Sequence, residues 1–373
     1  MSRAGAGVMS SRDALLATLA RLVAFDTRNP PRDLDAGSDV FAYLRDELTG
    51  FDIDLRDEGD GSVSLLATRG APEVLFNYHL DTVPVAEGWS RDPFSLHVGR
   101  ERATGLGACD IKGALAAMLT AARRTAGDLA ILITSDEEAG NSTCVRRYLA
   151  GDPPFRKVIV AEPTRCQAVT SHRGILSGRI TFNGVAGHAS SARALDDNAI
   201  HRAMKWGANA QLDVRGEPPL ENTALRGARF NIGRFEGGVK PNMIAASAMA
   251  AFNLRTPPAQ DQQDVIDALR ALAPEAHVED FSLPFQAPAL PTAERGEQAI
   301  ADAKRFAGEL GIELAEPVDF WTEASLFCAA GMTAIVVGSG DIAQAHTADE
   351  WVELEQLDAL THLYTRLIDH DIK

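Results

Sequence analysis

The chain has 373 residues, of which 45% are hydrophobic and 24% are charged, and its formal net charge at pH 7 is -16. This length predicts a large core and two or three domains. The acidic balance disfavours nucleic acid and anionic membranes as partners, because both attract clustered Lys and Arg. A small molecule or a metal is the better expectation.

Cysteine usage and the N-terminal segment bear on the compartment. The four cysteines, at positions 109, 144, 166 and 328, show no C-x-x-C spacing and suggest no disulfide framework, which favours a reducing cytosol. The first residues lack the apolar segment of a signal peptide, and no apolar run is long enough to span a bilayer. We therefore expect a soluble, cytoplasmic protein with no membrane partner.

Strands alternate with helices through the first part of the chain. Apolar spacing predicts helices at residues 13–25, 39–48, 112–124 and 143–149, and strands at 51–55, 62–68, 73–79, 129–133 and 157–161. From residue 298 the pattern resumes, with a helix to about 310, a strand at 333–337 and a helix at 354–368. This alternation predicts an α/β domain whose mostly parallel sheet is flanked by helices.

The middle of the chain follows a different order. Strands at 174–184, 228–235, 245–254 and 277–283 and helices at 196–212 and 261–272 give the sequence β-α-β-β-α-β. That order is typical of a ferredoxin-like α+β unit. We predict a catalytic domain of residues 1–172 and 286–373, interrupted by a second domain of residues 173–285.

A run of acids stands at the end of one predicted core strand. The segment 128–141 reads D-L-A-I-L-I-T-S-D-E-E-A-G-N, so Asp136, Glu137 and Glu138 directly follow apolar residues. Adjacent carboxylates repel one another and resist desolvation unless a cation compensates them. Taken alone, this stretch is better explained by a solvated loop, since acids that follow a strand commonly lie in water.

Similar residues follow other predicted strands. His79 and Asp81 end one strand, Glu162 follows another, and Asp110 begins a helix, while His346 lies in the loop after the last strand. Ligands of such sheets bind beyond the carboxyl ends of the strands. Carboxylate oxygens and imidazole nitrogens suit zinc, cobalt or manganese. Their number is too large for one tetrahedral ion and fits a two-metal hydrolytic site.

Other site types fit the sequence less well. Gly105 and Gly107 precede a helix, but the G-x-G-x-x-G pattern is incomplete, and Asp110 would direct a negative charge at a bound phosphate. The G-x-S-x-G elbow of a serine hydrolase has no match.

Motifs along nearly the whole chain resemble a known family. They are H-L-D-T-V-P at 79–84, G-L-G-A-C-D-I-K-G at 105–113, S-D-E-E-A-G at 135–140, A-E-P-T at 161–164, G-H-A-S at 187–190 and A-H-T-A-D-E at 345–350. Their order and spacing resemble the acetylornithine deacetylase and succinyl-diaminopimelate desuccinylase family of dinuclear metallohydrolases. Segments 319–327 and 343–350 look most similar to its N-acetyl-L-citrulline deacetylase branch.

The resemblance implies a ligand assignment. His79 and Glu162 would hold one divalent ion, Glu138 and His346 the other, and Asp110 would bridge them, with zinc or cobalt as the metal. It also implies a zinc exopeptidase-like catalytic domain, with the inserted ferredoxin-like domain as a lid that forms a homodimer. The peptide bond after Asp110 is expected to be cis.

The resemblance also implies catalytic roles. Glu137 would be the general base that produces a metal-bridged hydroxide. Asp81 would orient the imidazole of His79. His188 on the lid, often contributed by the partner subunit, would stabilise the oxyanion. The histidine could instead be a satisfied residue of a Gly-rich turn.

Substrate contacts are less specific in the sequence. Arg255 is a candidate for binding the substrate carboxylate because a guanidinium matches it bidentately, although a surface arginine on an edge strand is an alternative. Asn242 and Thr322 are further candidates, and Asn242 could simply be a turn residue after Pro241.

The implied reaction is hydrolysis of the acetyl amide of an N-acetyl-L-amino acid, N-acetyl-L-citrulline or N-acetyl-L-ornithine, in arginine biosynthesis. Alternatives are a succinyl-diaminopimelate desuccinylase, a related dipeptidase or aminopeptidase, and a non-catalytic metal-binding scaffold. A scaffold would have no reason to keep Glu137 beside intact ligands.

Overall fold

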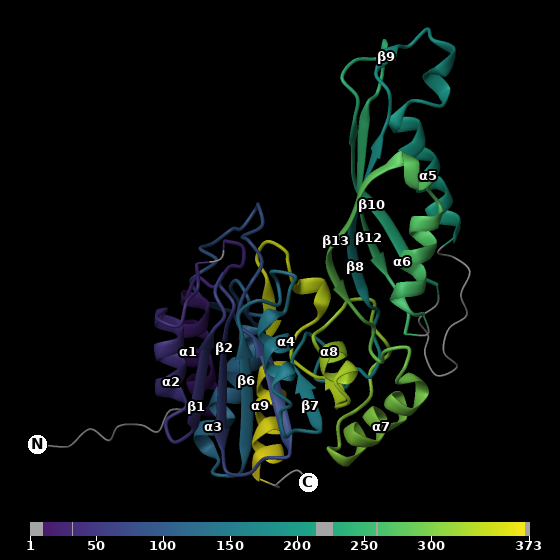
Figure 1. Cartoon of the computed structure of the whole chain (residues 1–373). Coiled ribbons are helices and arrows are strands. Elements are labelled where there is room, and N and C mark those ends of the chain that lie inside the picture. The colour runs from purple at the N-terminus through teal and green to yellow at the C-terminus, as the bar shows by residue number, and fades with distance from the viewer. Residues whose placement is uncertain (1–9, 32, 214–226, 259, 370–373) are drawn as a thin grey trace, which may run out of the picture. The chain divides into compact units, whose positions relative to one another are not determined.

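The computed structural model describes residues 10–31, 33–213, 227–258 and 260–369. Within them the backbone divides into two compact units (Figure 1). The first extends to Val169 and includes Ala303–Ala315 and the residues from Thr322 onward, and the second comprises Thr170–Asp302 and Glu316–Trp321. The predicted domain boundaries stay a prediction, because compactness alone does not show that a unit folds independently.

A mixed sheet forms the centre of the first unit. Its strands, in spatial order, are β1 (Asp52–Asp57), β2 (Val63–Arg69), β6 (Leu129–Thr134), β3 (Val74–His79), β7 (Lys157–Val160) and β14 (Thr333–Val336). β6, β3, β7 and β14 pair in parallel, whereas β1 and β2 add to the sheet in antiparallel orientation. The predicted α/β class with a mostly parallel sheet is confirmed.

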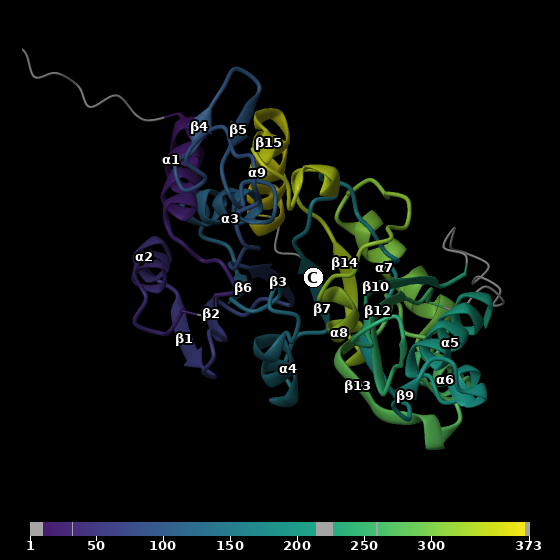
Figure 2. The ribbon, with the colours of Figure 1, turned by 90° about the horizontal axis from the view of Figure 1, so that it is seen from above.

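Helices cover both faces of this sheet. Figure 2 shows α1 (Ser11–Ala24), α3 (Lys112–Arg124) and α9 (Leu354–Asp369) on one face, and α4 (Thr143–Ala150) and α8 (Ala324–Ala329) on the other. All side chains of β3 and β6 are accordingly buried, which explains why both strands are rich in apolar residues. Further helices are α2 (Asp39–Glu47) and α7 (Gly296–Glu309).

Small residues let α3 pack closely. A Cβ added at Gly113 would lie 2.4 Å from the backbone oxygen of Ala108 and 3.1 Å from Cδ2 of Leu357 on α9. Glycine therefore fits here because a larger residue would collide with backbone. The helix is held directly against the loop that precedes it, and that loop carries Asp110.

A small sheet was not predicted from the sequence. It pairs β15 (Trp351–Glu353) with β5 (Arg102–Thr104) and β5 with β4 (His97–Val98). Strands of two or three residues are too short to show an alternating pattern. The pairing extends one residue beyond these strands. The amide of Gly105, which follows β5, donates to the backbone oxygen of Glu350, which precedes β15, at 3.0 Å.

The second unit has the predicted order β-α-β-β-α-β. Its elements are β8 (Ile175–Asn183), α5 (Ala199–Asp213), β10 (Arg229–Gly237), β12 (Ser247–Arg255), α6 (Gln262–Ala271) and β13 (Val278–Ala287). The antiparallel sheet runs β10-β12-β8-β13, and α5 and α6 cover one face of it (Figure 1). Trp206 of α5 is buried in the core between helix and sheet.

Short elements extend this unit. β9 (Gly187–His188) pairs with β11 (Met243–Ile244), so that His188 lies opposite Met243. Single-turn 3-10 helices occur at Ala192–Leu195 and Glu275–His277, and in the first unit at Ile342–Gln344. None of the helices in the described part of the chain combines the length and the hydropathy that a membrane span requires.

Candidate metal centre

The ends of three parallel strands bring the predicted ligands together. His79 is the last residue of β3 and pairs with Thr134, the last residue of β6. β7 also pairs in parallel with β3, and Glu162 follows its end by two residues. Since the strands run in the same direction, their carboxyl ends meet at one edge of the sheet.

A first ligand set comprises His79, Asp110 and Glu162. One ligand atom from each lies within 4.8 Å of the others. Nε2 of His79 is 3.1 Å from Oδ1 of Asp110 and 3.9 Å from Oε1 of Glu162. All three side chains are buried.

A second set comprises Asp110, Glu138 and His346, again with ligand atoms within 4.8 Å of one another. Nε2 of His346 lies 2.9 Å from Oε1 of Glu138 and 3.3 Å from Oδ2 of Asp110. Asp110 thus presents one oxygen to each set, which is the geometry of a bridging carboxylate. The peptide bond from Asp110 to Ile111 is cis, as predicted.

The electrostatics of the buried acids fit a site for cations. Burial raises the pKa of Glu162 well above its ordinary value, and the charge of Asp110 raises it further. Burial likewise raises the pKa of Glu137, with repulsion from Glu138 as the next cause. Divalent ions would relieve this repulsion, and oxygen and imidazole donors without thiolates suit zinc, cobalt or manganese. The residues therefore fit a pair of metal ions.

Asp81 links the histidine ligand to the acidic loop. Nδ1 of His79 donates to the backbone oxygen of Asp81 at 3.0 Å and lies 3.6 Å from its carboxylate. This bond fixes the tautomer and leaves Nε2 free for a metal. The carboxylate of Asp81 accepts the amides of Glu137 at 3.3 Å and of Glu138 at 2.9 Å.

The sequence assigned no role to Asp136, and the structure gives it one. Its side chain is fully buried, and Oδ2 accepts the amide of Cys144 in the first turn of α4 at 3.1 Å. Its backbone oxygen accepts the amide of Ser142 at 3.3 Å. Asp136 therefore closes the loop that carries Glu137 and Glu138.

Comparison with known proteins assigns the fold to a family. Residues 75–370 match the model of Peptidase family M20/M25/M40. The chain belongs to this family.

Among its curated M20 relatives is N-acetyl-L-citrulline deacetylase of Xanthomonas campestris pv. campestris, 46% identical over 96% of this chain and 99% of that protein. Acetylornithine deacetylase of Myxococcus xanthus is 29% identical over 96% and 97%. Solved structures with the same fold include the M20 metallo-carboxypeptidase Sso-CP2 from Sulfolobus solfataricus, with a TM-score of 0.73, 18% identity and coverage of 95% and 99%. The family resemblance expected from the motifs is confirmed.

Some predicted residues of this M20 chain lie in the second unit. His188 is exposed on β9, where its Nδ1 accepts the amide of Ser190 at 3.3 Å. Asn242 is also exposed, and its backbone oxygen accepts the amide of Ala189 at 3.1 Å, so it adjoins His188. Arg255 is half-buried at the last residue of β12, and its Nε donates to Oδ1 of Asn253 at 3.1 Å.

Thr322, the remaining substrate candidate, belongs to the first unit. Its side chain is fully buried, and its hydroxyl accepts the amide of Ala324 at 3.2 Å at the start of α8.

Sequence reasoning missed a buried carboxyl beside Thr322. Glu323 has 1% of its surface exposed, and its Oε1 has no hydrogen-bond partner among the described residues. Its charge is among the causes that raise the pKa of Glu137 and of Glu162. The only signal for burial in the sequence was its position between the aromatic pair Phe320-Trp321 and the apolar segment that forms α8.

Glu350 is a second missed carboxyl. It ends the A-H-T-A-D-E motif and is buried, and its two oxygens accept the amides of Gly107, Cys109 and Asp110. Its place in the same motif as His346 was the available signal.

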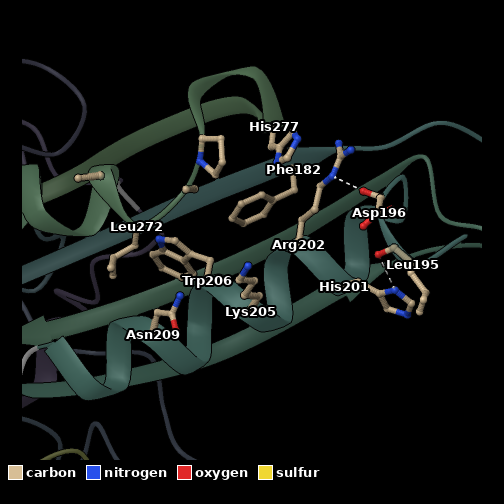
Figure 3. Close-up of a pocket in the computed structure, with 13 residues that line it drawn as sticks. Phe182, Leu195, Asp196, His201, Arg202, Lys205, Trp206, Asn209, Leu272 and His277 are labelled. Carbon is tan, nitrogen blue, oxygen red and sulfur yellow. Dashed lines mark hydrogen bonds between the residues drawn. The ribbon is translucent and has the colours of Figure 1, made fainter. Parts of the chain in front are cut away.

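A cavity of about 600 Å³ in the second unit has no predicted site residue in its lining. Figure 3 shows Lys205, Trp206 and Asn209 of α5 facing Leu272 and His277. The candidate metal centre is therefore assigned from the ligand geometry and not from this cavity.

Proposed function

We propose that the chain is a two-metal deacetylase that hydrolyses the acetyl amide of N-acetyl-L-citrulline, a reaction placed in arginine biosynthesis by its resemblance to the acetylornithine deacetylases. The observation that carries the proposal is 46% identity over nearly the full length to a protein named N-acetyl-L-citrulline deacetylase. The ligand sets that share Asp110 support a dinuclear centre.

His79 and Glu162 would hold one ion, Glu138 and His346 would hold the other, and Asp110 would contribute to both sites. A bound pair of zinc or cobalt ions would acidify the attacking water and polarise the amide carbonyl. The backbone oxygen of Asp81 keeps Nε2 of His79 available by accepting a hydrogen bond from Nδ1. By accepting their amides, the Asp81 carboxylate also holds Glu137 and Glu138 in place.

Glu137 acts as the general base. It belongs to neither ligand set, although it immediately precedes the ligand Glu138. Its carboxylate takes a proton from the attacking water and later passes it to the nitrogen of the leaving amine. Burial and the neighbouring charge of Glu138 raise its pKa, and a raised proton affinity suits a group that must both accept and return a proton.

His188 donates a hydrogen bond to the oxyanion. Its Nδ1 lies 2.8 Å from the hydroxyl oxygen of Ser190 and accepts the amide of Ser190 at 3.3 Å, so a ring proton on Nε2 would be available to donate. Asn242 lies beside His188 and would contact the same substrate.

We assign His188 and Asn242 to the active site of a partner subunit, and propose that Arg255 binds the carboxylate of a substrate. Within the second unit, Arg255 is the last residue of β12, whereas Asn242 precedes its first residue. The nine residues of β12 span about 26 Å at about 3.3 Å per residue. One small substrate cannot touch both ends of this strand in a single chain, which supports a homodimer.

Exposed apolar side chains in the second unit also support self-association. Val239 is 83% exposed and Leu195 is 75% exposed. Others are Val185, Met204, Phe235 and Met243. Six of the nine exposed large apolar side chains among the described residues belong to this unit, and exposed apolar surface can mark an interaction site. A cytoplasmic location is proposed from the cysteines, which are free thiols.

N-acetyl-L-ornithine is the second candidate substrate, because acetylornithine deacetylases are also similar over nearly the whole chain. The test compares amine release from N-acetyl-L-citrulline, N-acetyl-L-ornithine and N-succinyl-diaminopimelate by the cobalt-loaded protein and by Glu137→Gln. We expect N-acetyl-L-citrulline to have the highest kcat/KM. Glu137→Gln should keep both ions but lose at least about 100-fold in kcat, since general bases contribute at least that much.

The results of this assay distinguish the proposed function from its alternatives. A higher kcat/KM for another substrate would replace N-acetyl-L-citrulline in the proposal. Full turnover by Glu137→Gln would remove that residue from the base role. Bound metal without hydrolysis of any substrate by the unmodified protein would favour a non-catalytic scaffold.

A further inference from the structure

The carboxylate of Glu350 holds the backbone that presents Asp110. Its Oε1 accepts the amides of Cys109 at 2.8 Å and of Asp110 itself at 3.0 Å, and its Oε2 accepts the amide of Gly107 at 2.9 Å. The side chain is 2% exposed. When Glu350 is ionised, these hydrogen bonds are about twice as strong as neutral ones.

The sheet geometry explains why Glu350 reaches this loop. Glu350 immediately precedes β15, which pairs with β5, and the amide of Gly105 donates to the backbone oxygen of Glu350 at 3.0 Å. The chain leaving β5 therefore turns around the Glu350 carboxylate before it enters α3. The bonds to both side-chain oxygens fix the path of residues 107–110.

Glu350 also belongs to the segment that carries His346, four residues earlier. That segment packs directly on the Asp110 loop, since Sγ of Cys109 lies 3.4 Å from the backbone oxygen of Asp341. Nε2 of His346 lies 3.3 Å from Oδ2 of Asp110. One side chain thus ties together the loops of the bridging ligand and of a terminal ligand.

We propose that Glu350 is a positioning residue of the metal centre, which sets the backbone of Asp110 so that its two oxygens face the two ligand sets. This inference rests on the proposed two-metal function. Glu350 is not itself a ligand in this proposal, because it belongs to neither ligand set and both of its oxygens accept backbone amides.

The informative variant is Glu350→Gln, which keeps the shape but turns one oxygen into an amide donor. Glutamine accepts hydrogen bonds only through its single side-chain oxygen. Its NH2 group is a donor, so it would face at least one backbone amide that is also a donor. We expect cobalt affinity to fall about 10- to 100-fold, the usual effect of losing a group that supports a ligand. The visible spectrum of bound cobalt should change, and kcat should fall more than KM rises.

Glu353→Gln is the matched control, because Glu353 is exposed at the end of β15, three residues after Glu350, and its Oε2 accepts a hydrogen bond from Nε2 of Gln356. Cobalt binding is measured by calorimetric titration of metal-free protein. Unchanged affinity and spectrum in folded Glu350→Gln would overturn the inference, even if that variant unfolds at a lower temperature. Failure of the unmodified protein to bind two ions would instead contradict the proposed function, on which this inference rests.

Hydrogen exchange of the unmodified protein keeps the inference testable if Glu350→Gln does not fold. The amides of Gly107, Cys109 and Asp110 should exchange slowly, since they point to Glu350. Exchange at the rate of an exposed loop would overturn the inference.

Discussion

Glu323 should make the stability of the metal-free protein depend on pH. It is 1% exposed and lies close enough to Asp136 for their charges to interact. Burial, and next the charge of Asp136, raise the pKa of Glu323 from 4.5 to about 8. The perturbation is Glu323→Gln, which is uncharged at every pH and resembles the protonated acid in shape.

The sign follows from proton binding. Between pH 4.5 and about 8 the folded state holds the proton of Glu323 and the unfolded state has lost it. The free energy of unfolding therefore falls as the pH rises through this window, by about 1.4 kcal/mol per pH unit. Below the window Glu323 contributes no pH dependence, and above it the loss is constant.

The difference between Glu323→Gln and the unmodified protein isolates this group. From about pH 5.5 to about pH 7.5 the variant should gain about 3 kcal/mol relative to the unmodified protein. The assay is urea unfolding of both metal-free proteins at each pH. Glu355→Gln, at an exposed position on α9, is the control and should show no such trend.

A stability difference that stays constant across this pH range would refute the reasoning. It would mean that Glu323 ionises in the folded state as readily as in the unfolded state. Added cobalt should flatten the trend, because nearby dications favour the ionised carboxylate.

Two further predictions concern Glu138 as a metal ligand and the proposed homodimer. Glu138→Ala should reduce the bound metal from two ions to one, as measured by elemental analysis of desalted protein, and an unchanged content would remove Glu138 as a ligand. Mixing inactive His188→Ala and Glu137→Gln proteins should restore about a quarter of the activity, because half of randomly paired dimers contain one intact site. No recovery after verified subunit exchange would contradict a donor that acts across the dimer.

The sequence predicted the parts of the fold that follow from periodicity. Long apolar runs such as residues 129–133 appear as buried strands, and the helices agree within a few residues. The candidate ligands His79 and Glu162 were visible for the same reason, because they lie at or just after the ends of core strands whose direction the α/β pattern implies. The small sheet of β4, β5 and β15 was missed, since such short strands show no period.

Roles that depend on backbone amides could not be predicted. In the sequence, Glu350 cannot be distinguished from another acid near His346. Its proposed function follows from the backbone amides that donate hydrogen bonds to it. That convergence requires the pairing of β15 with β5, two segments separated by most of the chain. Side-chain type therefore indicated the metal chemistry, while the supporting contacts required coordinates.

Hydrogen bonding separates the acids of this site into candidate metal ligands and acids that hold the backbone around them. Both side-chain oxygens of Asp81 and of Glu350 accept backbone amides, and neither residue belongs to a ligand set. Glu138 and Glu162 instead face imidazole and carboxylate groups at the distances expected around a shared ion. Repulsion among these acids without a metal is the physical reason to expect that cation binding and folding stability are coupled. An acid that accepts several backbone amides can support the centre without a metal. An acid that accepts none needs a cation to compensate its buried charge.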